Sequence, residues 1–303
     1  MRYAERVFEI NIPPELCGRS VKAVMSGSFG MSSSIIKQIK YYQDGITVNG
    51  ERRRVNEILK TGDFLRLVLK DGGSELIEPA RMDIDIIYED EDIMIINKPP
   101  GTATHPSQGH HGDTLANGVM NIFAERGEIR TFRAVNRLDK DTSGLICIAK
   151  NCYAHSRLCE TLHSELKRRY IAITEGIIKE SGTVNAPIGR CSDSVIKRCV
   201  CDDGREAVTD YRPLACFGNY TLAELELHTG RTHQIRVHMA HIGHPLLGDW
   251  LYGTEDKALF PRPALHSAYM RLISPSNGKV LEFEAPLPKD MADFISKQKA
   301  PHS

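Results

Sequence analysis

The sequence predicts an α+β protein in two parts, a small N-terminal unit followed by a larger domain. The chain of 303 residues is long enough for both, with a sizeable core. Short strand-like segments are interspersed with segments of helical periodicity. The stretch Asp71-Gly72-Gly73-Ser74 has the composition of a flexible linker. We therefore expect a small domain over residues 1–72, a linker over 73–82, a large domain over 83–290 and a C-terminal tail over 291–303.

Composition is typical of a soluble globular protein, with 41% hydrophobic and 26% charged residues. No run approaches the roughly 20 apolar residues of a membrane span, and the first residues lack the apolar core of a secretion signal. We expect a cytoplasmic protein with no membrane partner. The eight cysteines form no Cys-x-x-Cys pair, which favours buried, reduced thiols over a zinc site. No coiled-coil stripe is present, so we expect a monomer.

Two short helices and a hairpin are predicted in the small domain. Serines at 32–34 are good N-cap residues, and isoleucines at 35, 36 and 39 form an apolar stripe. Asn49-Gly50 is a strong signal for a tight hairpin turn. The expected elements are helices at Ser20–Met25 and Ser32–Tyr42, and strands at Ile46–Val48, Arg52–Val55 and Phe64–Leu69.

The large domain is predicted to open with two strands, after which strands and helices are mixed. The stretch Asp113-Thr114-Leu115 is expected to cap the first of its helices, and Asn151 the second. The expected elements are strands at Ile84–Tyr88 and Asp92–Ile96, helices running to Ala124 and to Leu166, a strand around Tyr170 and a short helix after Pro288.

A dense group of charges precedes an apolar run. Arg137, Asp139, Lys140 and Asp141 fall within five positions, then the chain turns near Gly144 and continues apolar through residues 145–149. This pattern predicts a loop held at the start of a buried strand, with its acidic side chains facing a cleft. A solvated turn in front of a core strand is the alternative.

The string from Arg137 to Gly144 resembles the signature of the RluA family of RNA pseudouridine synthases. Three further stretches are similar to that family: Leu166–Ala172, Leu227–His238 and His244–Asp249. The resemblance as a whole covers about Asp83 to Pro288. The resemblance implies a catalytic domain with a mixed, mainly antiparallel sheet, and an isomerase that turns uridine into pseudouridine.

The resemblance also implies roles for individual residues. Asp139 would be the catalytic carboxylate, and Tyr170 would face the target base. Arg231 would be the guanidinium that keeps a buried Asp139 ionised, since burial disfavours the charged form and a cation restores it. Arg137 would help to hold the opened RNA. Asp141 is the competing carboxylate, to which we assign a turn-capping role. Because the reaction is an isomerisation, we expect no cofactor and no metal.

Residues 12–71 resemble the small alpha-L RNA-binding module. Net charge is zero, but basic clusters at 52–54 and 167–169 still favour a phosphate-binding partner, since binding depends on the local field. We take as candidate RNA contacts Lys37, Lys40, Arg52, Arg53 and Arg54. A small domain that only docks on its neighbour is the alternative.

One residue departs from the family pattern, and two rival functions remain open. Asn136 stands where the family commonly has histidine, and we interpret it as a structural substitute that cannot relay protons. A metallohydrolase would use the histidines at 233, 238, 241 and 244, although no His-Glu-x-x-His string is present. A catalytically silent RNA-binding ribosome-assembly factor is the second rival. As substrate we favour large-subunit ribosomal RNA, with transfer RNA as the alternative.

Overall fold

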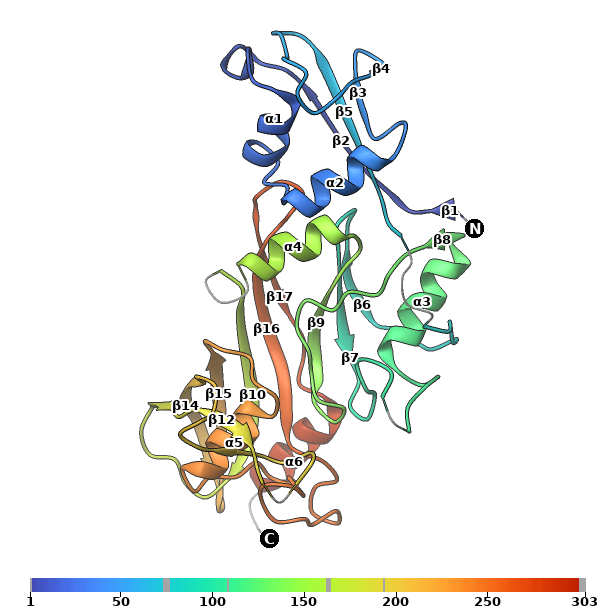
Figure 1. Ribbon diagram of the computed structural model, residues 1–303. Helices are drawn as coiled ribbons and strands as arrows, with labels where there is room; N and C mark the ends of the chain where they lie inside the picture. Colours follow the sequence, from blue (N-terminus) through green and yellow to red (C-terminus); the bar gives the residue numbers. More distant parts are fainter. Residues whose placement is uncertain (1, 73–76, 108, 162–164, 193, 300–303) are drawn as a thin grey trace.

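The computed structural model describes residues 2–72, 77–107, 109–161, 165–192 and 194–299. Figure 1 shows a small unit at one end of the molecule and a larger unit that contains the rest of the chain. The α+β prediction is confirmed: helices and strands are mixed along the chain, and the main sheet is largely antiparallel. No helix within the described ranges has the length and apolar character that crossing a membrane requires.

The small unit is a four-stranded antiparallel sheet with two helices; the two helices, the Asn-Gly turn and three of the strands were predicted, although β4 ends at Arg52 rather than Val55. The hydroxyls of Ser20 and Ser32 accept hydrogen bonds from backbone N–H groups three residues on. Asn49 and Gly50 have φ values of 53° and 83°, as a type I′ turn requires. In sheet order the strands are β2 (Glu5–Asn11), β5 (Phe64–Lys70), β3 (Ile46–Val48) and β4 (Glu51–Arg52); η1 (Pro14–Leu16), α1 (Val21–Gly27) and α2 (Ser33–Tyr41) complete the unit.

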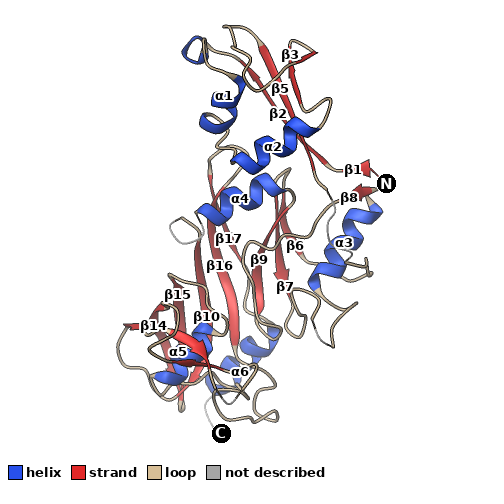
Figure 2. Ribbon diagram, viewed as in Figure 1, coloured by secondary structure: helices blue, strands red, loops and turns tan. Residues whose placement is uncertain are grey.

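A nine-stranded sheet forms the centre of the larger unit in the described part of the chain (Figure 2). Its neighbours are antiparallel except for β16 and β9, which run parallel. The order is β11 (Gly182–Asn185), β14 (Val208–Phe217), β15 (Tyr220–Leu227), β10 (Lys167–Glu175), β16 (Leu265–Ile273), β9 (Ser143–Ala149), β7 (Ile93–Lys98) and β6 (Ile86–Glu89), with β17 (Val280–Glu284) beside β16. The predicted mixed, mainly antiparallel sheet is therefore confirmed.

Four helices and two short strand pairs surround this sheet in the described ranges. The helices are α3 (Leu115–Glu125), α4 (Cys152–Glu160), α5 (Gln234–His241) and α6 (Lys289–Lys299). The strand pairs are β12 (Ile188–Arg190) with β13 (Arg198–Val200), and β1 (Arg2–Tyr3) with β8 (Glu128–Ile129). Thr114 and Asn151 cap α3 and α4 as predicted, but α4 ends at Glu160 rather than Leu166, because the chain leaves helical geometry at Thr161.

Both proposed boundary segments pack against the large domain. Of the expected linker, residues 73–76 lie outside the described residues. In the remainder, the backbone at Glu78 and Ala80 is hydrogen-bonded to Asn117 of α3. Of the expected tail, residues 291–299 belong to α6, where Met291 and Phe294 are buried in an apolar cluster with Phe260.

The small and large units share a core. The ring of Tyr153, on α4, lies 4.8 Å from that of Phe8 in an edge-to-face contact, and the Tyr153 hydroxyl donates to the carbonyl of Phe29. The side chain of Arg6 pairs with fully buried Asp92, and Arg133 pairs with buried Asp71 at 2.6 Å. Figure 1 accordingly shows α2 and α4 lying one above the other between the two sheets.

The expectation of buried thiols holds only in part. Cys147, in the middle of β9, is fully buried, and burial raises the pKa of its thiol. Three other cysteines are exposed, namely Cys17, Cys159 and Cys216. Burial is therefore not the general state of cysteine in this chain.

Candidate active site

The charged stretch before β9 is a loop, and each carbonyl from residue 138 to residue 141 accepts a hydrogen bond. The Thr104 hydroxyl donates to the carbonyl of Leu138, and the Thr142 N–H donates to that of Asp139. Buried lysine and arginine side chains, described next, hold the other two. Because its backbone is fixed along its length, the loop presents the Asp139 side chain in one orientation.

Lys98, at the end of β7, binds the backbone of the loop. Its side chain is completely buried, and its Nζ donates to the carbonyls of Pro99, Thr102 and Lys140 at 2.9 Å each. Burial lowers the pKa of Lys98 to about 7, although the carboxylates of Asp141 and Asp139 act in the opposite direction. Sequence reasoning did not identify this lysine, since a residue at the end of a predicted strand gave no sign of burial.

Arg262 holds the loop from the other side. Its Nη1 donates to the carbonyl of Asp141 at 2.9 Å, and its Nε and Nη2 pair with the carboxylate of Asp290, near the start of α6. The C-terminal helix therefore positions the arginine that positions the loop. The carbonyl of Asp141 is thus held within this framework.

Gly144 allows β9 to lie against β16 just after the loop. Its φ is 105°, and a Cβ at this position would lie 2.2 Å from the carbonyl oxygen of Ser267. Only glycine fits this geometry without a shift of the backbone. The turn predicted at this position is therefore required by the close approach of two strands.

Two basic side chains, Arg236 and His233, face the Asp139 carboxylate. Nη1 of Arg236 lies 3.4 Å from Oδ2 of Asp139, and Nε2 of His233 lies 4.0 Å from the same oxygen. The carboxylate is partly buried, with 27% of its side chain exposed. We expected Arg231 at this place, and that expectation is corrected: Arg231 instead donates from Nε to the carbonyl of Glu206.

Arg236 is itself held by a second carboxylate. Its Nε and Nη2 each bond Asp249 at 2.7 Å, in the two-pronged geometry that favours arginine over lysine. Asp249 is fully buried and accepts the backbone N–H groups of Leu251 and Tyr252. The family string contains both Arg231 and Arg236, and only the fold of α5 decides which one reaches Asp139.

A hydrogen-bonded chain fixes the tautomer of His233. Burial lowers the pKa of His233, so its ring is neutral at pH 7. Burial raises the pKa of Tyr252 to about 12, so its hydroxyl keeps its proton; because the hydroxyl oxygen already accepts the N–H of Arg198, we assign its proton to the contact of 2.9 Å with Nδ1 of His233. The proton of the ring is then on Nε2, the nitrogen that faces Asp139.

Tyr170 and Asp139 line one small pocket, which we call the aspartate pocket. Its other principal lining residues are Arg137, Arg231, His233 and Arg236. Tyr170, on β10, is 3% exposed, and burial raises the pKa of its phenol. The pocket is small, with a volume of about 50 Å³.

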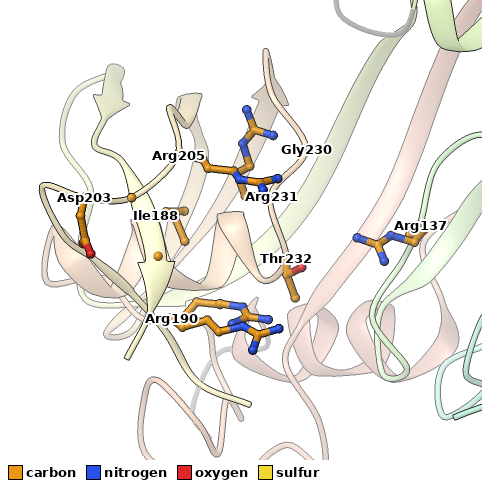
Figure 3. Close-up of a pocket in the computed structure, with 11 residues that line it drawn as sticks. Arg137, Ile188, Arg190, Asp203, Arg205, Gly230, Arg231 and Thr232 are labelled. Atoms are coloured by element: carbon orange, nitrogen blue, oxygen red, sulfur yellow. The ribbon is translucent and has the colours of Figure 1, made fainter. Parts of the chain in front are cut away.

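A second cavity, the arginine pocket, adjoins the aspartate pocket and shares Arg137 and Arg231 with it. It encloses 420 Å³ beside the β12–β13 hairpin, and arginines 190, 198 and 205 also line it. Figure 3 shows Arg137 facing Arg231 and Arg190 across an open space.

Comparisons with known proteins agree with this geometry. The family model described as RNA pseudouridylate synthase matches residues 92–241. The uncharacterised RNA pseudouridine synthase YjbO of Bacillus subtilis is 41% identical over 273 residues, which cover 89% of this chain and 96% of that protein. This chain belongs to the RNA pseudouridine synthases.

Other relatives place the synthase in the RluA-type branch. It is 36% identical to ribosomal large subunit pseudouridine synthase D of Pseudomonas aeruginosa, over 94% of this chain and 93% of that protein. The solved structure of human RNA pseudouridylate synthase domain containing 1 matches with a TM-score of 0.57 and 25% identity, covering 74% of this chain and 98% of that one. The synthase is therefore an isomerase that acts on RNA.

The histidines of the synthase do not gather around one point. His238 is buried between the Thr209 hydroxyl and the carbonyl of Ala186, and His244 bonds the carbonyl of Glu175. Among the described residues, no group of three His, Cys, Asp or Glu side chains has metal-binding geometry. The rival hypothesis of a four-histidine metal site is not supported by these positions.

The side chain of Asn136 forms hydrogen bonds with backbone groups. Its Oδ1 accepts the N–H of Cys147 at 2.8 Å, and its Nδ2 lies 3.4 Å from the carbonyl of Leu145. Both partners are on β9, and Asn136 is buried. These contacts join the segment before the loop to the strand after it.

The candidate RNA contacts of the small unit lie on its surface. Lys40 lines a cavity of 540 Å³ together with the Arg52–Arg54 triplet that follows the hairpin turn. Lys37 is exposed on α2 but does not line this cavity. Arg53 is engaged by Glu51 at 2.6 Å, which leaves Arg52 and Arg54 as the better candidates.

Proposed function

We propose that this synthase converts uridine to pseudouridine in large-subunit ribosomal RNA, with Asp139 as the carboxylate that engages the ribose. The observation that carries the proposal is the pairing of Asp139 with Arg236 in a pocket that also contains Tyr170. Relatives named ribosomal large subunit pseudouridine synthase D support the choice of RNA.

The chemistry needs an ionised carboxylate beside the sugar. As the bond between N1 of uracil and C1′ breaks, positive charge develops at the ribose, and a carboxylate stabilises it or bonds to it. The guanidinium of Arg236 lies 3.4 Å from the Asp139 carboxylate and the His233 ring 4.0 Å from it, so a fixed positive charge stands beside this acid. The freed uracil then turns, C5 bonds to C1′, and the proton on C5 is lost while N1 gains one.

Asp141 is the weaker candidate for this role. The residues that line the aspartate pocket include Asp139 but not Asp141. The Asp141 carbonyl is held by Arg262, which anchors the loop. Its position therefore favours the turn-supporting role over direct contact with the sugar.

The target uridine must leave its base stack to reach Asp139, at a cost of a few kcal/mol. Tyr170 offers an aromatic face for the everted base, and Arg137 lies at the mouth of the pocket, where it supports the opened strand. The raised pKa of Tyr170 keeps its hydroxyl protonated before substrate binds. Turnover by Tyr170→Phe would assign stacking to the ring, and loss of turnover with intact binding would assign proton transfer to the hydroxyl.

The nucleophile is tested with Asp139→Asn, which keeps the size of the side chain and removes its charge. We expect no pseudouridine from this variant, while RNA binding stays within a factor of about three, since an amide occupies the same space. Asp141→Asn is the matched control and should retain turnover. Full activity of Asp139→Asn would reject the assignment.

The target is tested by mapping pseudouridines in total RNA from cells with and without the gene. We expect positions that vanish from large-subunit ribosomal RNA when the gene is deleted. Losses confined to transfer RNA would overturn the proposed substrate and leave the chemistry intact.

A further inference from the structure

The aspartate pocket contains a histidine with an uncommon backbone conformation. Among the described residues, only Asn49 and His233 have a positive φ without being glycine, and the φ of His233 is 59°. Asn49 lies in a hairpin turn, where this conformation is ordinary. At a histidine beside a reacting group, a left-handed backbone is a reason to ask what the side chain does. The fold holds the His233 ring at the pocket in spite of this conformation.

His233 and Tyr252 form a pair in which a proton can pass from oxygen to nitrogen. The Tyr252 hydroxyl lies 2.9 Å from Nδ1 of His233, and Nε2, on the other side of the ring, lies 4.0 Å from Oδ2 of Asp139. With the tautomer assigned above, Nε2 directs its proton toward the reacting carboxylate while Nδ1 accepts the hydroxyl proton of Tyr252. An imidazole that gives up the first proton can therefore gain the second at once.

The surroundings of Tyr252 suit a transient phenolate. The backbone N–H of Arg198 donates to its oxygen at 2.9 Å, and the cationic groups of Arg236 and Lys197 lie 5.1 Å and 6.0 Å from its ring centre. One donor and two cations stabilise negative charge that appears on this oxygen when its proton moves to His233. In the resting enzyme, burial raises the pKa of Tyr252 and keeps the proton on the oxygen.

The reaction needs a proton carrier, since one proton must leave C5 of uracil and one must reach N1. Each of these atoms is bonded to C1′ in turn, so each stands close to Asp139 when it exchanges its proton. One group beside that carboxylate can therefore serve both. Among the ionisable residues that line the pocket, Asp139 is engaged with the sugar and the arginines keep their protons, which leaves His233 and Tyr170. Of these two, His233 is backed by the hydroxyl of Tyr252.

We propose that His233 carries the proton between C5 and N1 of the uracil, with Tyr252 as the positioning residue that completes a proton relay. This inference rests on the proposed function, because it takes Asp139 as the group that engages C1′.

The relay works in two steps that leave both side chains unchanged. As the bond between N1 and C1′ breaks, N1 keeps the electron pair and takes the proton of Nε2, while the Tyr252 hydroxyl passes its proton to Nδ1 and becomes a phenolate. After C5 has bonded to C1′, Nε2 takes the proton of C5, and the electron pair of that bond forms the double bond between C5 and C6. Nδ1 then returns its proton to Tyr252. One proton has moved from C5 to N1.

The test compares single-turnover rates of pseudouridine formation, with enzyme in excess over RNA. The substrate is total RNA from cells that lack the gene, which contains the unmodified target whichever RNA carries it. His233→Asn suits the left-handed backbone and keeps an N–H donor, but an amide does not titrate. We expect its rate to fall about 100-fold, the scale of general acid–base catalysis, and that of Tyr252→Phe to fall by a comparable factor.

Chemical rescue separates proton transfer from a structural role. His233→Gly fits the positive φ and leaves room for a free imidazole. At about pH 8, where an imidazole is mostly neutral, added imidazole should restore most of the lost rate. In contrast, 1-methylimidazole is close to it in size but has no N–H, and should restore none. His233→Gly combined with Tyr252→Phe should not respond to imidazole, because the relay then has no second member.

Controls show that the variants are folded and still bind RNA. Binding of a fluorescent twelve-nucleotide oligouridylate gives the salt slope, the change of log K with log salt, which is about 0.7 for each phosphate contact of a single strand. Because neither substitution removes a positive charge, the salt slope should stay at its native value. His228→Asn, at an exposed histidine that pairs with Asp210, is the matched control and should keep the native rate. Thermal melting identifies any variant that has lost its fold.

A native rate in His233→Asn would contradict the proposal and leave Tyr170 as the proton carrier, and a native rate in Tyr252→Phe would remove the relay. A response of His233→Gly to both imidazoles alike, or to neither, would also refute it. Failure of the proposed function is seen separately, as turnover by Asp139→Asn or as no pseudouridine from the native enzyme.

Discussion

At the scale of single residues, one guanidinium serves two carboxylates. Arg236 bonds Asp249 with two nitrogens and presents the third to Asp139. Asp249 is fully buried and Asp139 is partly exposed, so the two acids differ in their access to substrate. The buried acid orients the arginine, and the accessible one is available for chemistry.

We expect Arg236→Gln to destabilise the protein by about 3–5 kcal/mol, because it leaves the buried charge of Asp249 without its ionic partner. Arg231→Gln should change stability by less than about 0.5 kcal/mol, since the structure gives Arg231 no ion pair to lose. Urea denaturation of both variants measures the difference. Equal stabilities would contradict the assignment of Arg236.

The residue scale is also where sequence reasoning was least complete. The motif match selected Asp139 and Tyr170, and both line the aspartate pocket. It selected Arg231 as the partner of Asp139, because two arginines five positions apart in one string cannot be ranked without the start of α5. Lys98 and Arg262 were missed, since their role depends on carbonyls more than 40 residues away in the chain.

At the scale of elements, the charged loop is held by cations that come from two sides. Lys98 comes from the end of β7, while Arg262 is fixed by α6 through Asp290. The side chains of Lys98 and Arg262 thus donate hydrogen bonds to loop carbonyls that have no partner within the loop. Sequence patterns placed most of these elements well, because caps and apolar periodicity are local signals.

Several strands of the structure, among them β14–β17, were not predicted, and two elements show why such misses and overextensions arise. Strand β2 was not predicted. The alternation of buried and exposed side chains along Glu5–Asn11 becomes evident only when this segment pairs with β5. The helix α4 was drawn six residues too long, because nothing in the sequence before Leu166 marks the departure from helical geometry at Thr161. The apolar residues Met291, Phe294 and Ile295 predict that α6 packs on the domain. The apolar cluster that they join could not be predicted from the sequence.

The buried lysine predicts a specific dependence of stability on pH. In the folded protein Lys98 releases its proton above about pH 7, whereas the unfolded chain keeps it to about 10.5. Between these values the unfolded state binds more protons, so this group makes stability rise with pH. The free energy of unfolding of native protein, relative to Lys98→Met, should rise by up to about 1.4 kcal/mol per pH unit between pH 7 and 9.

Denaturation of both proteins at several pH values in this window gives that comparison. Ionisation of all other groups is common to the two proteins and cancels in the difference. A difference that stays constant from pH 6 to pH 9 would mean that Lys98 keeps its ordinary pKa.

At the scale of the whole molecule, the small unit and the catalytic domain share buried contacts. Asp92 and Asp71 each pair with an arginine from the other unit, and Tyr153 completes the apolar core of the small unit. The boundary near residue 72 is clear in composition, but the sequence did not show that buried groups cross it.

This shared core affects how the RNA-binding role of the small unit is tested. Deletion of residues 1–72 would also expose Tyr153 and remove the partners of Asp92 and Arg133, so charge variants are preferable. We expect Arg52→Gln with Arg54→Gln to reduce the salt slope of oligouridylate binding by about 1.4.

The matched control is Arg19→Gln with Arg66→Gln, since exposed Arg19 and half-buried Arg66, which pairs with Glu9, belong to the same unit and do not line the cavity. An equal loss of slope in the control would indicate that general positive charge, and not this surface, attracts the RNA. No loss in either pair would favour a small unit that only docks on its neighbour.

The position of Tyr153 has a consequence for how this architecture is inherited. Tyr153 belongs to the large domain by sequence but packs in the core of the small unit. Changes at the surface of one domain are therefore constrained by the surface of the other. A chimera that transplants the small unit onto another enzyme should therefore remain well folded only when the recipient helix brings an aromatic side chain to the same place.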